Sequence, residues 1–218
     1  MAEEDWTDTA QSWDAWYRTD RPPWETDRPQ PAVQRLLDEA AFRGGVLDVG
    51  CGSGENALEL ASHGLQVLGV DWAAAAVDMA RAKAAERSLD VEFEVADAHR
   101  LDLLGRSFDT ILDSALFHTF SDEARSTYVP SLASVTRTGS VVFLLCFSDL
   151  EPWGGGPRRV TQAEIREAFA DGWVVRSIEP ERYAMRLSPG YALAWLATIE
   201  RHATADPSNS TSGDLAGT

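Results

Sequence analysis

The sequence predicts an α/β protein with a Rossmann-like, doubly wound and mostly parallel sheet of seven strands, in three α/β/α layers. Two observations support this prediction. Short apolar runs alternate with helix-like segments through most of the chain, which is the rhythm of βαβ units. A glycine-rich turn, Gly50-Cys-Gly-Ser-Gly54, joins one such run to the helix that follows, and polar ligands bind at turns of this kind.

The expected elements follow from apolar periodicity and from the turn residues at their ends. We expect strands at residues 46–50, 66–71, 91–97, 108–114, 140–147, 173–178 and 194–199. We expect helices at residues 31–42, 55–63, 73–87, 122–137 and 161–170. Pro31 suits a first helical position, Gly64 ends a helix, and Thr161 with Glu164 forms a capping box. The run at 140–147 is apolar throughout, which predicts a strand buried on both faces.

The chain divides into three regions. Residues 1–30 form an aromatic N-terminal cap segment, residues 31–203 a single ligand-binding domain, and residues 204–218 a polar tail whose composition predicts disorder. In the cap segment Trp13, Trp16 and Tyr17 have helical spacing and share one face. We expect these rings to pack on the core, to close over a ligand, or to do both, since a flat ring also suits a cationic group.

The charge balance bears on the kind of partner. The chain has 35 acidic and 19 basic residues, a formal net charge of −16, and a single lysine, Lys83. Such a surface repels phosphate backbones, so we expect a small-molecule ligand and no nucleic acid. No apolar run approaches the ~20 residues that span a bilayer, and the acidic N-terminus does not resemble a signal peptide. We therefore expect a cytoplasmic protein without a membrane partner, whose Cys51 and Cys146 are reduced and bind no metal.

Acidic residues follow four successive strands, in phase with the glycine turn. Asp48 lies at the first strand, Asp71 ends the second, Asp97 the third and Asp113 the fourth. A carboxylate at Asp71 is placed to accept the two hydroxyls of a ribose. A dinucleotide-binding oxidoreductase is the alternative of similar architecture, but Glu55 stands where the third glycine of its motif would fall, and a carboxylate there repels a pyrophosphate.

The pattern D-x-G-x-G-x-G from Asp48 to Gly54 resembles the first motif of class I S-adenosylmethionine-dependent methyltransferases. The resemblance implies S-adenosylmethionine as cofactor, S-adenosylhomocysteine as its product, and an antiparallel strand at the C-terminal end of the sheet. It implies that Asp97 receives the adenine amino group and that Asp113 faces the methionine part. The remaining cofactor contacts implied are Trp24, Gly50, Cys51, Gly52, Gly54, Asn56, Trp72, Ala98 and Ser114.

The N-terminal segment Trp13-Asp-Ala-Trp-Tyr, followed by Pro23-Trp24 and Pro29-Gln-Pro31, resembles the thiopurine and thiol S-methyltransferase-like group. Residues 113–120, 146–149 and 156–160 are similar to small actinobacterial enzymes within that group. By that analogy Trp24 covers the cofactor and the first helix closes the acceptor pocket. We expect the acceptor to contact Trp13, Trp16, Tyr17, Phe117, His118 and Trp153.

His118 is the candidate catalytic residue, because it follows the fourth strand and a hydroxyl or amine acceptor benefits from a general base. Local packing of the ring is the alternative, and a thiolate or halide acceptor needs no base. Methyl transfer to an O, N or S atom of a small, aromatic molecule, a secondary metabolite or xenobiotic, is therefore the expected activity. A cofactor-binding protein without turnover remains open, as does the choice between monomer and homodimer.

Overall fold

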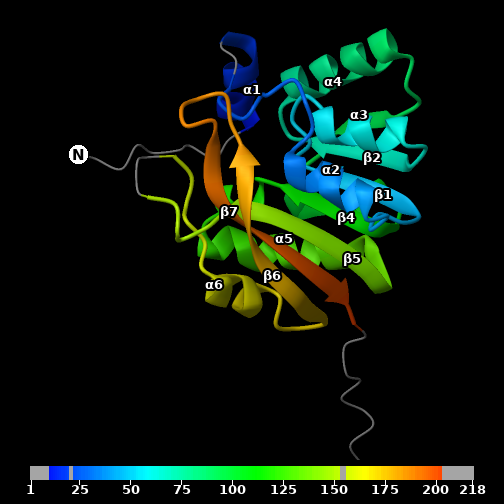
Figure 1. Cartoon of the computed structure of the whole chain (residues 1–218). Coiled ribbons are helices and arrows are strands. Elements are labelled where there is room, and N and C mark those ends of the chain that lie inside the picture. Colours follow the sequence, from blue (N-terminus) through cyan, green and yellow to red (C-terminus); the bar gives the residue numbers. More distant parts are fainter. Residues whose placement is uncertain (1–9, 20–21, 153–155, 203–218) are drawn as a thin grey trace, which may run out of the picture.

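The computed structural model describes residues 10–19, 22–152 and 156–202. Its seven strands form one sheet in the order β3-β2-β1-β4-β5-β7-β6 (Figure 1). The strands are β1 Gly45–Val49, β2 Gln66–Asp71, β3 Glu92–Val95, β4 Phe108–Ser114, β5 Thr136–Phe147, β6 Trp173–Ala184 and β7 Tyr191–Arg201. The α-helices are α1 Ala10–Thr19, α2 Pro31–Asp38, α3 Glu55–Ser62, α4 Ala74–Arg87, α5 Asp122–Ser134 and α6 Gln162–Ala168. Two 3₁₀ segments, η1 Ala98–Leu104 and η2 Phe117–Thr119, follow β3 and β4.

The first five strands are parallel, and β7 runs antiparallel to both β5 and β6. The predicted doubly wound sheet and its antiparallel C-terminal strand are thus confirmed. Since β1 lies between β2 and β4, the strand order reverses there, and the carboxyl ends of β1, β2 and β4 meet at one edge. The glycine turn after β1 lies at this edge, which we call the carboxyl edge.

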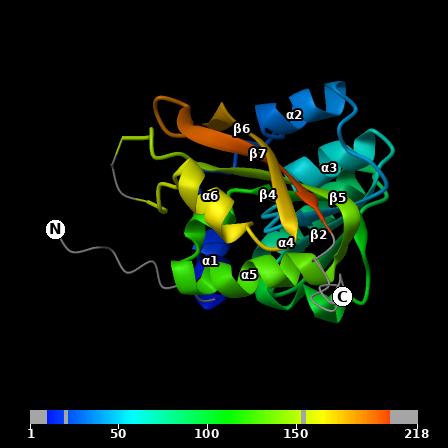
Figure 2. The same ribbon diagram turned by 90° about the horizontal axis from the view of Figure 1, so that it is seen from below.

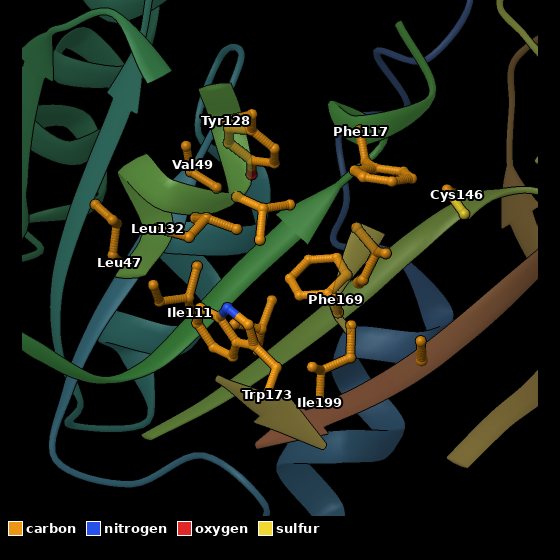
Figure 3. Packing of buried hydrophobic residues seen from close by; sticks show 14 of the residues in the cluster. Leu47, Val49, Ile111, Phe117, Tyr128, Leu132, Cys146, Phe169, Trp173 and Ile199 are labelled. Carbon is orange, nitrogen blue, oxygen red and sulfur yellow. The ribbon is translucent and has the colours of Figure 1, made fainter. Parts of the chain in front are cut away.

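Alternating side chains of β1 divide the core into two layers. Val46 packs toward α2, α3 and α4, whereas Leu47 and Val49 pack toward α5 and α6. Figure 2 shows α2 and α3 on one side of the sheet and α5 on the other. On the α5 side, the buried rings of Phe117, Tyr128, Phe169 and Trp173 belong to one core cluster against the sheet (Figure 3). This layer rigidly supports the carboxyl ends of the strands.

Several element bounds differ from the expectation. Helix α2 ends at Asp38 rather than Phe42, because Ala40 takes a left-handed conformation and Ala41 donates its N–H back to the carbonyl of Leu36. Helix α5 ends at Ser134, and β5 begins at Thr136, four residues earlier than expected. The largest miss is the C-terminal hairpin, where β6 and β7 are each far longer than the two short strands expected.

Three further expectations concern the start of α6, the C-terminal tail and membrane-spanning helices. Thr161 caps α6 and makes the predicted capping box with Glu164. The tail at 204–218 lies outside the described residues. No helix among residues 10–19, 22–152 and 156–202 combines the length and apolarity required to cross a membrane.

Gly54 lies in a tightly packed part of the glycine turn. It has a φ of +87°, and a Cβ built on it would lie 2.8 Å from the Phe93 ring and 2.9 Å from Ala80 Cβ. Gly64 has a similar φ of +81° with nothing within 4 Å. We expect Gly54→Ala to lower the free energy of unfolding by about 1–3 kcal/mol more than Gly64→Ala, because both substitutions strain the backbone and only the first clashes. Urea unfolding of the two variants measures this difference, and equal losses would contradict it.

Candidate active site

The glycine turn has left-handed backbone conformations, and side chains of Leu116 and Tyr17 lie close to it. Gly50, Gly52 and Gly54 all have positive φ. A Cβ on Gly50 would lie 3.0 Å from Leu116, and a Cβ on Gly52 would lie 2.7 Å from the Tyr17 hydroxyl. These glycines therefore supply both the unusual backbone angles and the close approach that the sequence pattern predicts.

Asp71 ties the turn to the end of β2. Its two carboxylate oxygens accept hydrogen bonds from the N–H of Gly52 at 2.9 Å and the N–H of Ala73 at 2.8 Å. Burial raises the pKa of Asp71 despite these bonds. Each oxygen has a second lone pair, so the carboxylate is able to accept ligand hydroxyls while it holds the turn in place.

Asp48 is a buried carboxyl group without a counterion. Its side chain is fully buried on the α3 side of β1, and neither oxygen has a hydrogen-bond partner of good geometry among the described residues. Burial, then the charges of Asp71 and Asp113, raise its pKa to about 8, and the nearby amide of Ala57 opposes part of that rise. Near neutral pH Asp48 is therefore mostly protonated, and a cationic ligand beside it would favour its ionised form.

Asp113 plays a different part from the one expected. Its carboxylate accepts hydrogen bonds from the N–H groups of Leu116 and Phe117, at 3.0 and 3.2 Å, and from the Tyr128 hydroxyl at 2.8 Å. Burial raises its pKa to about 6, although these three donors lower it. The side chain thus shapes the turn from β4 into η2 and is already engaged with the protein. Ser114 follows it at the strand end.

The expected adenine slot lies beyond β3. Asp97 caps η1 by accepting the N–H of His99 at 2.8 Å, and Ala98 next to it is half-buried against the core. Trp72, which follows Asp71, is 41% exposed. These three residues follow the neighbouring strands β2 and β3, as the sequence predicts, and the Trp72 side chain is partly exposed.

The cap segment closes on the glycine turn. Trp24 donates its indole N–H to the Tyr17 hydroxyl at 3.0 Å, and its ring contacts those of Trp13 and Trp16, with centroids 5.7 and 5.9 Å away. Helix α1 packs against α4, beside which it lies in Figure 1. Burial raises the pKa of the Tyr17 phenol well above its usual value, and Asp71 and Glu25 add to the rise.

Glu25 and Gln30 hold the cap against the domain, and neither was among the site residues expected from the sequence. Buried Glu25 accepts hydrogen bonds from the hydroxyl and, at 3.4 Å, the N–H of Ser53, with Lys83 Nζ 3.8 Å away. Gln30 accepts the N–H of Ala184 at 2.7 Å and donates to its carbonyl at 3.2 Å. The backbone N–H of Gln30 also donates to Asn56 Oδ1 at 2.9 Å, which occupies that oxygen of an expected cofactor residue. Such long-range partners cannot be seen in local sequence patterns.

The expected acceptor residues are only partly brought together. Phe117 is fully buried and packs against Tyr128 and Phe169 (Figure 3), so it is a core residue rather than a pocket wall, a correction to our expectation. His118 lies on η2 with its ring 4.4 Å from that of Phe147 at the end of β5. Trp153 lies outside the described residues.

Comparisons with known proteins show which family the chain resembles. A family model described as a methyltransferase domain matches residues 46–139. The 2-heptyl-1-hydroxyquinolin-4(1H)-one methyltransferase of Mycobacteroides abscessus is 38% identical over 165 residues, which cover 74% of this chain and 73% of that protein. The chain belongs to the S-adenosylmethionine-dependent methyltransferases. It is thus an enzyme that methylates a small molecule, and the oxidoreductase and the non-catalytic alternatives are not favoured.

Solved structures extend the similarity over most of the methyltransferase. A structure entitled for the conversion of a disulfide bond into a thioacetal group during echinomycin biosynthesis is 34% identical, with a TM-score of 0.82 over 89% of this chain and 93% of the other. Magnesium protoporphyrin IX methyltransferase from Synechocystis, solved with S-adenosylmethionine, shares the fold at 21% identity, with a TM-score of 0.63 over 91% of this chain and 94% of the other.

The residues of the carboxyl edge fit S-adenosylmethionine, which carries a sulfonium and an ammonium group against one carboxylate. Asp48 is unpaired, Asp71 is able to accept further hydrogen bonds, and the glycine turn offers a cradle without side chains. The start of α3, where a pyrophosphate would bind, already faces the carboxylate of Glu25, which disfavours a dinucleotide. Within the described ranges no three His, Cys, Asp or Glu residues cluster as metal ligands.

Asp48 makes stability depend on pH with a definite sign. A carboxyl group whose pKa is raised on folding favours the folded state below its unfolded pKa, near 4, and that contribution disappears as pH rises through about 8. We expect Asp48→Asn to stabilise the cofactor-free enzyme at pH 8 by about 1–3 kcal/mol, with little effect near pH 4. Thermal unfolding from pH 4 to pH 8.5 measures this difference. Asp102→Asn, at an exposed aspartate, is the control, and an equal gain in both variants would contradict the assignment.

Proposed function

We propose that this methyltransferase methylates a hydroxyl oxygen borne by a planar heteroaromatic molecule. The observation that carries the proposal is a group of rings where β4, β5 and β6 meet the cap. The centroid of the Phe147 ring lies 4.4 Å from that of His118 and 5.6 Å from that of Tyr183. Burial, and then the charge of Glu25 in the cap, raise the pKa of the Tyr183 phenol. Stacked and edge-on aromatic surfaces of this kind suit a flat acceptor. The mycobacterial relative, whose name gives a hydroxyquinolinone as its substrate, supports the same acceptor class.

The chemistry requires positioning above all. Bound S-adenosylmethionine supplies a methyl group on a positively charged sulfur, which makes the leaving group neutral. The protein's part is to hold the two reactants in line and to exclude water. The cap serves the second purpose, because its hydrogen bonds to Ser53, Asn56 and Ala184 bridge the glycine turn and β6.

We assign the expected cofactor contacts as part of this proposal. The carboxylate of Asp71 binds the ribose, Asp97 with Ala98 and Trp72 binds the adenine, and the glycine turn with Asp48 binds the methionine part. The Asp113–Ser114 backbone, rather than the engaged Asp113 carboxylate, faces the methyl group. Trp24 covers the cofactor, and Trp13 and Trp16, which contact it, form the roof of the acceptor pocket.

A sulfur acceptor is the second candidate, and one observation favours it. The structure related to thioacetal formation matches this chain at 34% identity over nearly its whole length. A thiol borne by a heteroaromatic ring would use the same ring group and the same cap. Membership of the thiopurine and thiol S-methyltransferase-like group belongs to this proposal.

The remaining expectations about partners rest on charge. A net charge of −16 supports a small-molecule acceptor rather than nucleic acid, and a cytoplasmic monomer or homodimer is the state we propose for it. Sedimentation of the purified chain measures the oligomeric state directly.

The acceptor class is tested with three probes: 1-hydroxyquinolin-4-one, quinoline-4-thiol, and N-methylacetohydroxamic acid as an aliphatic control. We expect methylation of the quinolinone oxygen, with kcat/KM roughly 100-fold above that of the hydroxamic acid, because only the aromatic probes are able to stack on the rings of this group. Mass spectrometry of the products measures transfer and identifies the atom methylated. Equal turnover of the aliphatic control, or no turnover of either quinoline by enzyme that binds the cofactor, would overturn the proposal.

A further inference from the structure

His118 is held in one tautomer by the backbone of β5. The N–H of Phe147 donates a hydrogen bond to Nδ1 of His118 at 2.9 Å, and the carbonyl of Phe147 accepts the N–H of Val160 at 2.9 Å. A backbone amide donates and never accepts, so Nδ1 bears a lone pair and the proton of the neutral ring lies on Nε2. Within the described residues Nε2 makes no hydrogen bond, so its proton is available to a ligand.

The surroundings keep this ring neutral and electropositive. The side chain is buried, and this burial, followed by the guanidinium charges of Arg125 and Arg159, lowers the pKa of His118 to about 3. Arg125 lies on α5 and holds η2 by stacking on Phe117, with its Cζ 4.3 Å from the ring centroid. The titratable and charged groups on the elements around the ring are Asp113, Cys146, Arg125, Arg158, Arg159, Glu164 and Tyr183, and Glu164 pairs with both Arg125 and Arg158.

These groups leave no route for His118 to act as a base. Nε2 already carries a proton, and Nδ1 is occupied by the Phe147 amide. The carboxylate of Asp113, on the adjoining strand end, accepts three hydrogen bonds from the protein. The phenol of Tyr183 and the thiol of Cys146 have raised pKa values, mainly through burial, and are therefore neutral. An acceptor bound beside His118 meets the Nε2–H donor, which favours an anion. The charges of Arg125 and Arg159 also act on the His118 ring, although Glu164 pairs with Arg125 at 3.2 Å.

We propose that Nε2–H of His118 donates a hydrogen bond to the acceptor heteroatom and that the acceptor enters as an anion, an inference that rests on the proposed function. The substrates are then heteroaromatic N-hydroxyl, hydroxyl or thiol compounds acidic enough to ionise near neutral pH. Aliphatic alcohols and unactivated amines are poor substrates, because no group beside the ring, among the residues that the structure describes, is free to take their proton.

The transfer step needs no proton movement. The acceptor's proton has passed to solvent before binding. The acceptor oxygen forms the new bond to the methyl carbon with its own electron pair, while the carbon–sulfur bond breaks and its pair stays on sulfur. An oxyanion and a sulfonium become a neutral methyl ether and a neutral thioether. His118 Nε2–H stabilises the anion, orients it, and keeps its own proton throughout.

The tautomer is tested first, without any acceptor. Nitrogen-15 NMR of the full-length enzyme saturated with S-adenosylhomocysteine identifies the His118 signals by their loss in His118→Gln, among the four histidines. We expect Nδ1 to be unprotonated and Nε2 protonated from pH 6 to pH 9. A protonated Nδ1, or a titration of the ring within this range, would overturn the inference.

The acceptor's ionisation is tested by absorbance of 1-hydroxyquinolin-4-one bound to the same complex. We expect its pKa to fall by about one unit on binding to the wild type and to His118→Gln, whose amide is able both to accept and to donate, and to be unshifted with His118→Ala. Binding of S-adenosylhomocysteine by each variant confirms that it is folded. A neutral bound acceptor, or the same shift with His118→Ala, would contradict the proposal.

Kinetics separate this inference from the proposed function. The kcat/KM profile of the wild type is expected to inflect at the pKa of the free acceptor, and to move with it when a more acidic ring-nitrated analogue is used. His118→Ala is expected to lower kcat/KM roughly 100-fold, and His118→Gln to stay within about tenfold of the wild type. An inflection at one fixed pH for both acceptors would refute the anionic entry alone. Absence of turnover with every heteroaromatic probe would instead refute the proposed function.

Discussion

The structure depends on a cluster of carboxyl groups held out of water at the carboxyl edge of the sheet. Asp48 is fully buried in β1. Asp71 accepts a hydrogen bond from the glycine turn, and Asp113 accepts one from the turn into η2. Each has a raised pKa, because burial outweighs the hydrogen bonds that favour the charged form. An unpaired buried carboxyl group destabilises a fold, so its presence is best explained by a cationic ligand that relieves it.

The cap and the glycine turn are joined by contacts among charged and polar side chains. Lys83, the chain's single lysine, lies 2.8 Å from Glu55 and 3.8 Å from Glu25, so it partly balances the acidic groups around the start of α3. Glu25 in turn bonds to Ser53 in the turn itself. In the proposed binding mode, cofactor binding and cap closure therefore share residues, and a cofactor covered by the cap would be shielded from water where the methyl group is transferred.

Much of this arrangement could be predicted from the sequence, because it depends on local signals. The apolar runs predicted the strands of the sheet. The D-x-G-x-G-x-G pattern and the aspartates at the strands predicted that a ligand binds at the carboxyl edge. The contacts that could not be predicted join distant segments: Gln30 with Ala184, Tyr128 with Asp113, and the Phe147 amide with His118. The last of these changes the chemistry expected of His118, since a strand position that no periodicity specifies decides which ring nitrogen carries the proton.

The central claim, that a cationic cofactor favours the ionised form of a buried carboxyl group at the carboxyl edge, is tested most directly by calorimetry. S-adenosylmethionine is titrated into the enzyme at pH 7 in two buffers of different ionisation enthalpy, with S-adenosylhomocysteine and NAD in parallel. A carboxyl group with a pKa of about 8 is mostly protonated at this pH, and a nearby cation lowers that pKa. The account predicts that S-adenosylmethionine binds with release of a proton, that S-adenosylhomocysteine releases less, and that NAD does not bind. Binding heats that are identical in the two buffers would contradict it.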